Sequence, residues 1–137
     1  MESTEKAGNS VHAVKDSVHV DRLDRLRADG NAAFKAGNLQ TAKRHYTAAI
    51  SLAESMADEP VEKLQSTRRA QLLANRCQVS LALERVTDAL SDAQAACSSA
   101  PGWPKAHYRL GTVLLSRKEY LKAYGAFKQA PHLDVKN

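Results

Sequence analysis

Small residues recur along this chain at two fixed spacings. Ala123 and Ala130 stand 34 residues after Ala89 and Ala96, and Ala89 stands 47 residues after Ala42. Because 47 exceeds 34 by 13, the pattern predicts three similar units with an insertion of about 13 residues after the first. One unit of this size is too small to form a core alone, so the units are expected to stack on one another.

Apolar residues within each unit follow helical spacing. In the last unit, Leu110 and Leu114 are four residues apart, and Tyr120, Ala123 and Phe127 follow one another at three and four residues. Each set lies on one face of a helix, so each unit is predicted as a helical hairpin. The predicted helices run from about 21 to a stop at Gly37–Asn38, from 39 to 56, from 61 to 83 and from 86 to 98, followed by one that begins at Pro104 and one that ends near Gln129.

The repeated residues resemble those of tetratricopeptide-repeat domains, whose period is about 34 residues. The matching residues are Leu26, Gly30, Phe34, Gly37, Leu39, Ala42, Tyr46 and Ala49 in the first repeat, Leu73, Ala89, Ala96 and Pro101 in the second, and Leu110, Gly111, Tyr120, Ala123, Phe127 and Ala130 in the third. Three positions depart from the family pattern: Cys77 and Glu84 replace glycine, and Pro131 stands where the last helix should continue. The resemblance implies an all-α fold, a right-handed superhelix of three helical hairpins in which the insertion elongates the first hairpin.

The resemblance also implies a domain organisation. We expect a flexible N-terminal tail at 1–20, a repeat domain at 21–134 and a short C-terminal end at 135–137. Within the domain, the three repeats are expected at about 23–56, 70–103 and 104–134, with the insertion at about 57–69. Residues 1–16 are polar and are expected to lack regular structure. Val11, Val14, Val18 and Val20 are nevertheless placed to give the first helix a short extension.

Composition and charge narrow the classes of function. No apolar run approaches the roughly 18 residues of a membrane helix, and the first residues do not resemble a secretory signal. The net charge of +5 is spread over many predicted helix faces, without a basic run or interleaved aromatic residues. We therefore expect no nucleic-acid partner and no membrane span.

Sequence motifs for catalysis or for metal binding are also missing. The chain has no glycine-rich phosphate loop, no metal-spaced His/Cys cluster and no nucleophile motif, which predicts a binding module that is not an enzyme and needs no cofactor or metal. Cys77 and Cys97 have no Cys-x-x-Cys spacing. They are predicted to be reduced, buried thiols, which favours a cytoplasmic protein, with the nucleus as the alternative.

Five polar residues match the site with which tetratricopeptide domains of the co-chaperone type bind a peptide. In that family a cation and an asparagine of the first helix, an asparagine of the third helix, and a lysine and an arginine of the fifth helix clamp two carboxylates. The matching residues are Arg27, Asn31, Asn75, Lys105 and Arg109, with Arg27 standing where lysine is commoner. The resemblance implies the C-terminal Glu-Glu-Val-Asp tail of heat-shock protein 70 or 90 class chaperones as the ligand.

The chemistry of these residues suits that ligand. A C-terminal aspartate presents a main-chain and a side-chain carboxylate, for which Lys105 and Arg109 offer charged donors and the two asparagines offer neutral donors. Taken singly, Arg27 or Lys105 would be read as an ordinary surface cation, and an asparagine could instead bond the backbone. Five suitable residues in one register favour the clamp.

Three further residues near these positions have open roles. Phe34 follows Asn31 by about one turn and Leu81 follows Asn75 by six residues. Each is predicted either to form an apolar pocket for the peptide or to pack in the core. His107 lies between Lys105 and Arg109, and we expect a packed imidazole there rather than a ligand or a base.

The sequence therefore leaves two functions for a chain that we expect to be a monomer. The first is a co-chaperone adaptor that holds an acidic chaperone tail in its groove. The alternative is a tetratricopeptide scaffold or targeting-receptor domain that binds an unrelated partner. Dependence of binding on a free terminal carboxylate distinguishes the two.

Overall fold

The computed structural model describes residues 2–56 and 62–130, with side chains from 18–56 and 66–130. Its six helices are α1 (Glu2–Lys35), α2 (Leu39–Ser55), α3 (Glu62–Ala82), α4 (Val86–Ser99), α5 (Pro104–Ser116) and α6 (Tyr120–Lys128). The described residues contain no strand. This confirms the predicted all-α fold, and every predicted helix boundary except the start of α1 lies within two residues of its place in the structure. No end was predicted for α5 and no start for α6.

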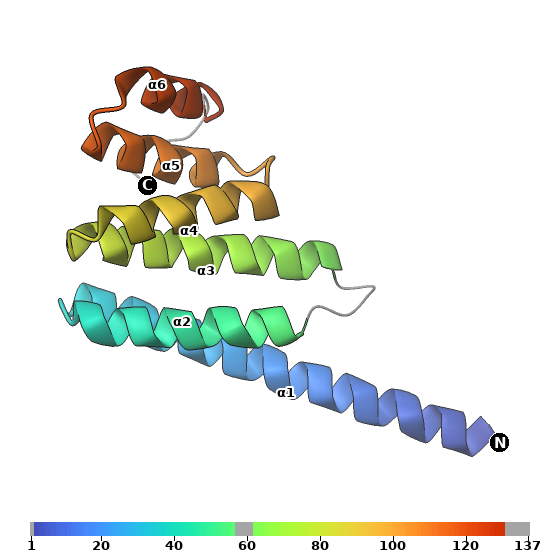
Figure 1. Ribbon diagram of the computed structural model, residues 1–137. Helices are drawn as coiled ribbons and strands as arrows, with labels where there is room; N and C mark the ends of the chain where they lie inside the picture. The colour runs from blue at the N-terminus through green and yellow to red at the C-terminus, as the bar shows by residue number, and fades with distance from the viewer. Residues whose placement is uncertain (1, 57–61, 131–137) are drawn as a thin grey trace.

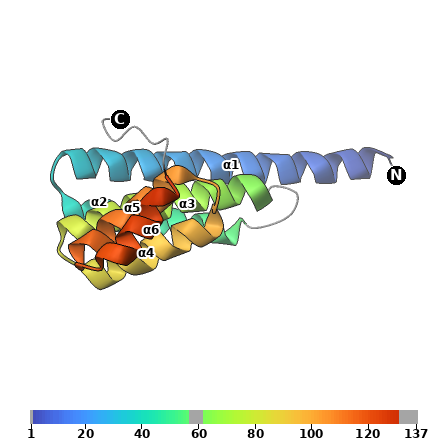
Figure 2. The same cartoon turned by 90° about the horizontal axis from the view of Figure 1, so that it is seen from above.

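The start of α1 differs from the expected N-terminal tail. Helix α1 begins at Glu2, so most of the segment 1–20 is helical, and Figure 2 shows it extending beyond the other helices. A physical reason lies in the sequence: no proline interrupts residues 2–35, and Val11, Val14 and Val18 keep helical spacing. The expectation that residues 1–16 lack regular structure is therefore wrong with respect to secondary structure.

The helices form three antiparallel hairpins stacked in chain order, α1 with α2, α3 with α4, and α5 with α6 (Figure 1). Each hairpin contacts the next through α2 with α3 and through α4 with α5, and α3 also contacts α5. The first, third and fifth helices thus follow one another through the stack. The handedness of the predicted superhelix stays a prediction.

The insertion coincides with the two longest helices of the stack after α1. Helix α2 has 17 residues and α3 has 21, compared with 14 in α4 and 13 in α5. These lengths are compatible with an insertion that lengthens the helices on either side of it. Pro60, which directly precedes the helix predicted at 61–83, lies outside the described residues, as do Pro131 and the end at 135–137.

Within the first hairpin and within the third, a close contact holds the two helices together where they cross. A Cβ atom added to Gly30 would lie 2.6 Å from Cε1 of Tyr46, and one added to Gly111 would lie 2.5 Å from Cε1 of Phe127. Both distances are far below van der Waals contact, so each aromatic ring lies directly on a glycine.

The second hairpin reaches the same fit with different residue sizes. Cys77 replaces the glycine, and Ala93 stands at the repeat position that Tyr46 and Phe127 occupy in the other hairpins. Cys77 and Ala93 are fully buried in one apolar cluster. A larger residue on the first helix is thus accompanied by a smaller one on the second, which explains the departure of Cys77 from the family pattern.

In the turn of each hairpin, one residue adopts the left-handed backbone conformation. Gly37, Glu84 and Lys118 occupy equivalent positions and have φ values of 82°, 62° and 63°. The next N–H bonds a carbonyl five residues back in all three turns, as from Arg85 to Ser80 at 2.8 Å. These bonds satisfy carbonyls at the helix end. Glu84 therefore adopts the glycine conformation despite its side chain, at a cost of order 1 kcal/mol.

A charged pair joins the two helices of the second hairpin, and its arginine also contacts the first hairpin. The guanidinium of Arg76 on α3 binds both carboxylate oxygens of Asp92 on α4, at 2.8 and 2.7 Å, and its other nitrogen lies 3.3 Å from Thr47 Oγ1 on α2. The side chain of Asp92 is only 8% exposed. The Asp92 hydrogen bond is the main cause that raises the pKa of Arg76.

The cysteines agree with the sequence prediction of reduced thiols. Both are free, Cys77 being buried and Cys97 half-buried. Burial raises the pKa of the Cys77 thiol to about 12, so that thiol is protonated at neutral pH. Among the described residues, no helix is long and apolar enough to cross a bilayer, and no group of three or more potential His, Cys, Asp or Glu ligands is assembled.

We expect Gly30→Ala and Gly111→Ala each to lower the free energy of unfolding by about 1–3 kcal/mol, because the new methyl group overlaps an aromatic ring. Gly125→Ala is the matched control, since a Cβ there has no neighbour within 4 Å. That control should be neutral or stabilising by up to about 1 kcal/mol, because alanine favours helix. Urea unfolding followed by circular dichroism measures all three. Equal stability of the three variants would contradict the crossing geometry.

We expect Asp92→Ala to lower the free energy of unfolding by roughly 2–4 kcal/mol, because it leaves the half-buried Arg76 without its bidentate partner. Glu54→Ala removes the carboxylate of an exposed pair with Arg69 and should cost less than about 1 kcal/mol. The same unfolding measurement compares the two. Similar losses for both variants would show that the Asp92 pair does not join α3 and α4 as described.

Candidate functional site

A cleft of about 370 Å³ is formed by the first, third and fifth helices of the stack. It is lined by Asp24, Arg27, Ala28 and Asn31 of α1, Gln71 and Asn75 of α3, Trp103 of the turn before α5, and Lys105 of α5. Four of the five residues predicted for the clamp, Arg27, Asn31, Asn75 and Lys105, thus lie around one cleft. They come from sequence positions as far as 78 residues apart.

Helical spacing positions these side chains. Arg27 and Asn31 are four residues apart on α1, so they lie on one face about one turn from each other. Gln71 and Asn75 are related in the same way on α3. Stacking of α1, α3 and α5 brings their polar faces to the cleft while their apolar faces bury the core. Pro104 begins α5 immediately before Lys105.

Arg109 lies outside the lining of this cleft. It stands one turn beyond Lys105 on α5, and its Nη2 donates to Oε1 of Gln78 on α3 at 3.2 Å. Its guanidinium also lies 5.9 Å from the ring centroid of Tyr108. Arg109 therefore faces α3, as a clamp residue should, but farther along the helices than the other four residues.

The charges of the cleft are mostly positive. Of the two cations that line it, Arg27 has a carboxylate neighbour, Asp24 Oδ1 at 3.7 Å, and it also donates to Gln71 Oε1 at 3.4 Å. The two side chains of that pair are 42% and 52% exposed, so the pair is solvated. Within the described side chains, neither Lys105 nor Arg109 forms an ion pair with a carboxylate. Their charges are available to an anionic ligand.

The amide of Asn31 has one defined partner. The hydroxyl of Tyr46, on α2, donates a hydrogen bond to Asn31 Oδ1. Tyr46 is 2% exposed, whereas Asn31 is exposed at the cleft. A buried donor on the second helix thus reaches the exposed amide on the first.

Phe34 and Leu81 do not line the cleft. Phe34 packs against the large apolar cluster of the first two hairpins, and Leu81 packs against the cluster that contains Cys77 and Val113. Both are half-buried. Core packing, one of the two roles that the sequence left open for each residue, is therefore present in the structure, while a role in peptide binding stays a prediction.

His107 is packed, as the sequence predicted. Its Nε2 donates to the carbonyl oxygen of Pro101 at 2.7 Å, and its Nδ1 lies 3.7 Å from Sγ of Cys97. Because Nε2 carries the proton that it donates to the carbonyl oxygen, Nδ1 can accept a hydrogen bond from the thiol of Cys97. The imidazole thus closes the turn between α4 and α5 and does not face the cleft.

Three lining residues were not identified from the sequence. Asp24 lies three residues before Arg27, and Gln71 lies four residues before Asn75, so helical spacing could have revealed both. Trp103 lies in the turn before α5, for which no periodic pattern predicts a direction. Only the packing of that turn against α3 brings it to the cleft.

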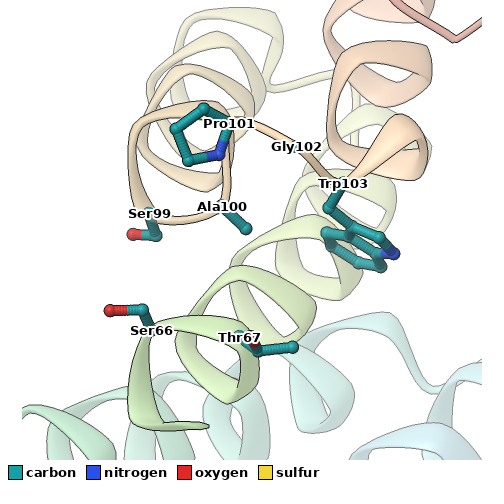
Figure 3. A pocket seen from close by; sticks show the side chains of 7 residues that line it. All are labelled: Ser66, Thr67, Ser99, Ala100, Pro101, Gly102 and Trp103. Carbon is teal, nitrogen blue, oxygen red and sulfur yellow. The ribbon is translucent and has the colours of Figure 1, made fainter. Parts of the chain in front are cut away.

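Trp103 also borders a second, larger hollow of about 600 Å³ (Figure 3). Its other lining residues are Ser66, Thr67, Ser99, Ala100, Pro101 and Gly102. None of these residues is charged, and Figure 3 shows the hollow between the start of α3 and the turn that follows α4. The smaller cleft therefore holds the groups that can bind an anion.

No model of a known protein family matches the chain. The Hsp70-Hsp90 organizing protein of Triticum aestivum is 32% identical over 114 residues, which is 83% of this chain. The match spans only 17% of the length of that relative.

Solved structures resemble this fold over most of their length. The tetratricopeptide-repeat (TPR) domain of Arabidopsis OM64 has a TM-score of 0.69 and 27% identity, over 87% of this chain and 88% of that one. The second TPR domain of Spaghetti (RPAP3), solved with the Hsp90 peptide SRMEEVD, has a TM-score of 0.68 and 22% identity, over 86% of this chain and 99% of that one. With its repeat spacing, its three hairpins and these similarities, this chain has the fold of a tetratricopeptide-repeat domain.

Proposed function

We propose that this chain is a co-chaperone adaptor domain that binds the C-terminal acidic tail of Hsp70 or Hsp90 class chaperones. The observation that carries the proposal is the convergence of Arg27, Asn31, Asn75 and Lys105 on one cleft. The names of the wheat relative and of the Spaghetti complex support the choice of ligand. The chain contributes binding and positioning, with no reaction of its own.

The ligand chemistry follows from the donors in the cleft. A peptide that ends in aspartate carries two carboxylates on its last residue, and each carboxylate oxygen accepts hydrogen bonds only. Arg27 and Asn31 would bind one carboxylate from α1, with Asn75 beside them on α3. Lys105 would bind the other from α5. Charge-assisted hydrogen bonds of this kind contribute about 1.5–3 kcal/mol each.

Asp24 limits the excess of positive charge. Its carboxylate is paired with Arg27 in the free domain, so an entering carboxylate must compete with it. The pair is exposed and therefore weak, which makes the exchange inexpensive. Trp103 forms an apolar part of the lining beside Lys105.

Arg109 would act farther along the peptide or after a change of side-chain conformation. Its present partner, Gln78, is neutral. A carboxylate would make a stronger bond with the guanidinium than the amide oxygen does. We therefore keep Arg109 in the proposed site, at its edge, with Phe34 and Leu81 as candidates for contact with the part of the peptide that precedes the acidic tail.

The location that we propose is the cytoplasm, with the nucleus as the alternative. Two free cysteines, one fully buried and neither in a disulfide, support a reducing compartment.

We expect a peptide that ends in Met-Glu-Glu-Val-Asp to bind with a dissociation constant near micromolar, about −8 kcal/mol. The same peptide with an amidated C-terminus should lose most of this affinity, because one of the two carboxylates is gone. Isothermal titration calorimetry of both peptides tests the proposal. Equal binding of both, or no binding of either, would remove the clamp and favour a scaffold for another partner.

We expect Lys105→Ala and Arg109→Ala each to weaken binding of the free-acid peptide at least tenfold, because each removes a charged donor. Lys105 is exposed and Arg109 is half-buried. Arg44→Ala is the matched control, since Arg44 is an exposed cation on α2 whose side chain bonds only Thr41 among the described residues. The control should bind as the wild type does, and all three variants should keep their helicity. Unchanged affinity in both test variants would refute the assignment of these residues.

A further inference from the structure

The exposed amide of Asn31 accepts a hydrogen bond from a buried hydroxyl. Tyr46 belongs to α2, which contributes no residue to the lining of the cleft, and its hydroxyl donates to Asn31 Oδ1. An asparagine amide has an accepting end and a donating end. With Oδ1 bonded to Tyr46, the Nδ2 amino group is left for the cleft that Asn31 lines.

The third hairpin shows that packing does not require this hydroxyl. Phe127 covers Gly111 as closely as Tyr46 covers Gly30, with ring atoms 2.5 and 2.6 Å from the place that a methyl group on each glycine would take, and Phe127 has no hydroxyl. The residue after Gly111 is Thr112, whose hydroxyl bonds the carbonyl of Tyr108 on its own helix. The aromatic hydroxyl is thus present in the hairpin whose next residue is an asparagine at the cleft.

We infer that Tyr46 is a positioning residue of the anion cleft, whose hydroxyl orients the Asn31 amide so that a donor faces the ligand. An amide turned the other way would present Oδ1 to a carboxylate, and two acceptors repel each other. The inference rests on the proposed function, because the orientation matters only if the ligand is an anion. It assigns to one hydroxyl a role in binding that is separate from the role of its ring in folding.

The protonation state of Tyr46 supports this role. Burial raises the pKa of the Tyr46 phenol above its usual range near 10. The hydroxyl therefore stays a donor throughout the physiological pH range, and the amide orientation should not depend on pH there.

The test uses the substitution Tyr46→Phe, which keeps the ring on Gly30 and removes only the hydroxyl. We expect Tyr46→Phe to weaken binding of the free-acid peptide about three- to tenfold, which is the usual loss for one hydrogen bond. The same substitution in an Asn31→Ala background should have no effect on affinity, because the residue through which Tyr46 acts is gone. Tyr120→Phe, at an exposed tyrosine on α6, is the control and should bind as the wild type does.

A measurement on the free domain separates this inference from the proposed function. Nuclear magnetic resonance relaxation of the Asn31 side-chain amide should show an ordered group in the wild type and a more mobile one in Tyr46→Phe. The inference would be overturned if the Asn31 amide were equally ordered in the wild type and in Tyr46→Phe. It would also be overturned if Tyr46→Phe weakened peptide binding equally in the wild-type and the Asn31→Ala backgrounds. If the wild type fails to bind the peptide while the amide still loosens, the positioning stands and the proposed ligand is wrong.

Discussion

The whole stack depends on the close approach of the two helices within each hairpin. In the first and third hairpins an aromatic ring lies on a glycine, and in the second a cysteine lies near an alanine at the corresponding positions. Only small residues on one side leave room for the neighbouring helix, so a larger residue on one helix is matched by a smaller one on the other. Hairpins that close in this way present similar surfaces to one another and can stack.

The cleft is a consequence of that stacking. Each hairpin places its first helix on the same side, so side chains from α1, α3 and α5 meet although they are far apart in the sequence. No single helix holds enough donors for two carboxylates. The Arg76–Asp92 pair joins α3 to α4, and the apolar core packs the helices against one another. The cleft residues can therefore stay exposed and charged.

Local features of the fold could be predicted from the sequence, whereas the directions of several side chains could not. The helix boundaries predicted between 35 and 104, and the end of α6 near 129, followed from spacing, from Pro104 and from the turn signals, because these are local properties of the chain. The start of α1 was not predicted because residues 1–16 are polar, although Val11, Val14 and Val18 keep helical spacing. For Phe34 and Leu81, periodicity identifies a helix face but cannot decide whether a residue at the edge of that face meets the core or the groove. Trp103 was missed because the direction of a turn residue depends on the element that it packs against.

The sequence by itself determined the repeat, the helices and four residues that belong to one cleft. Repeat register is a linear property, and it places corresponding faces of the first helices of the three units on the same side of the stack. The tertiary structure alone decided that Arg109 bonds Gln78 outside the cleft, that Asp24 pairs with Arg27, and that Tyr46 holds the Asn31 amide. These contacts depend on side-chain directions across helices and on separations of a few ångströms. Spacing along the chain carries no such information, since it specifies a face of a helix and not the atom that the face meets.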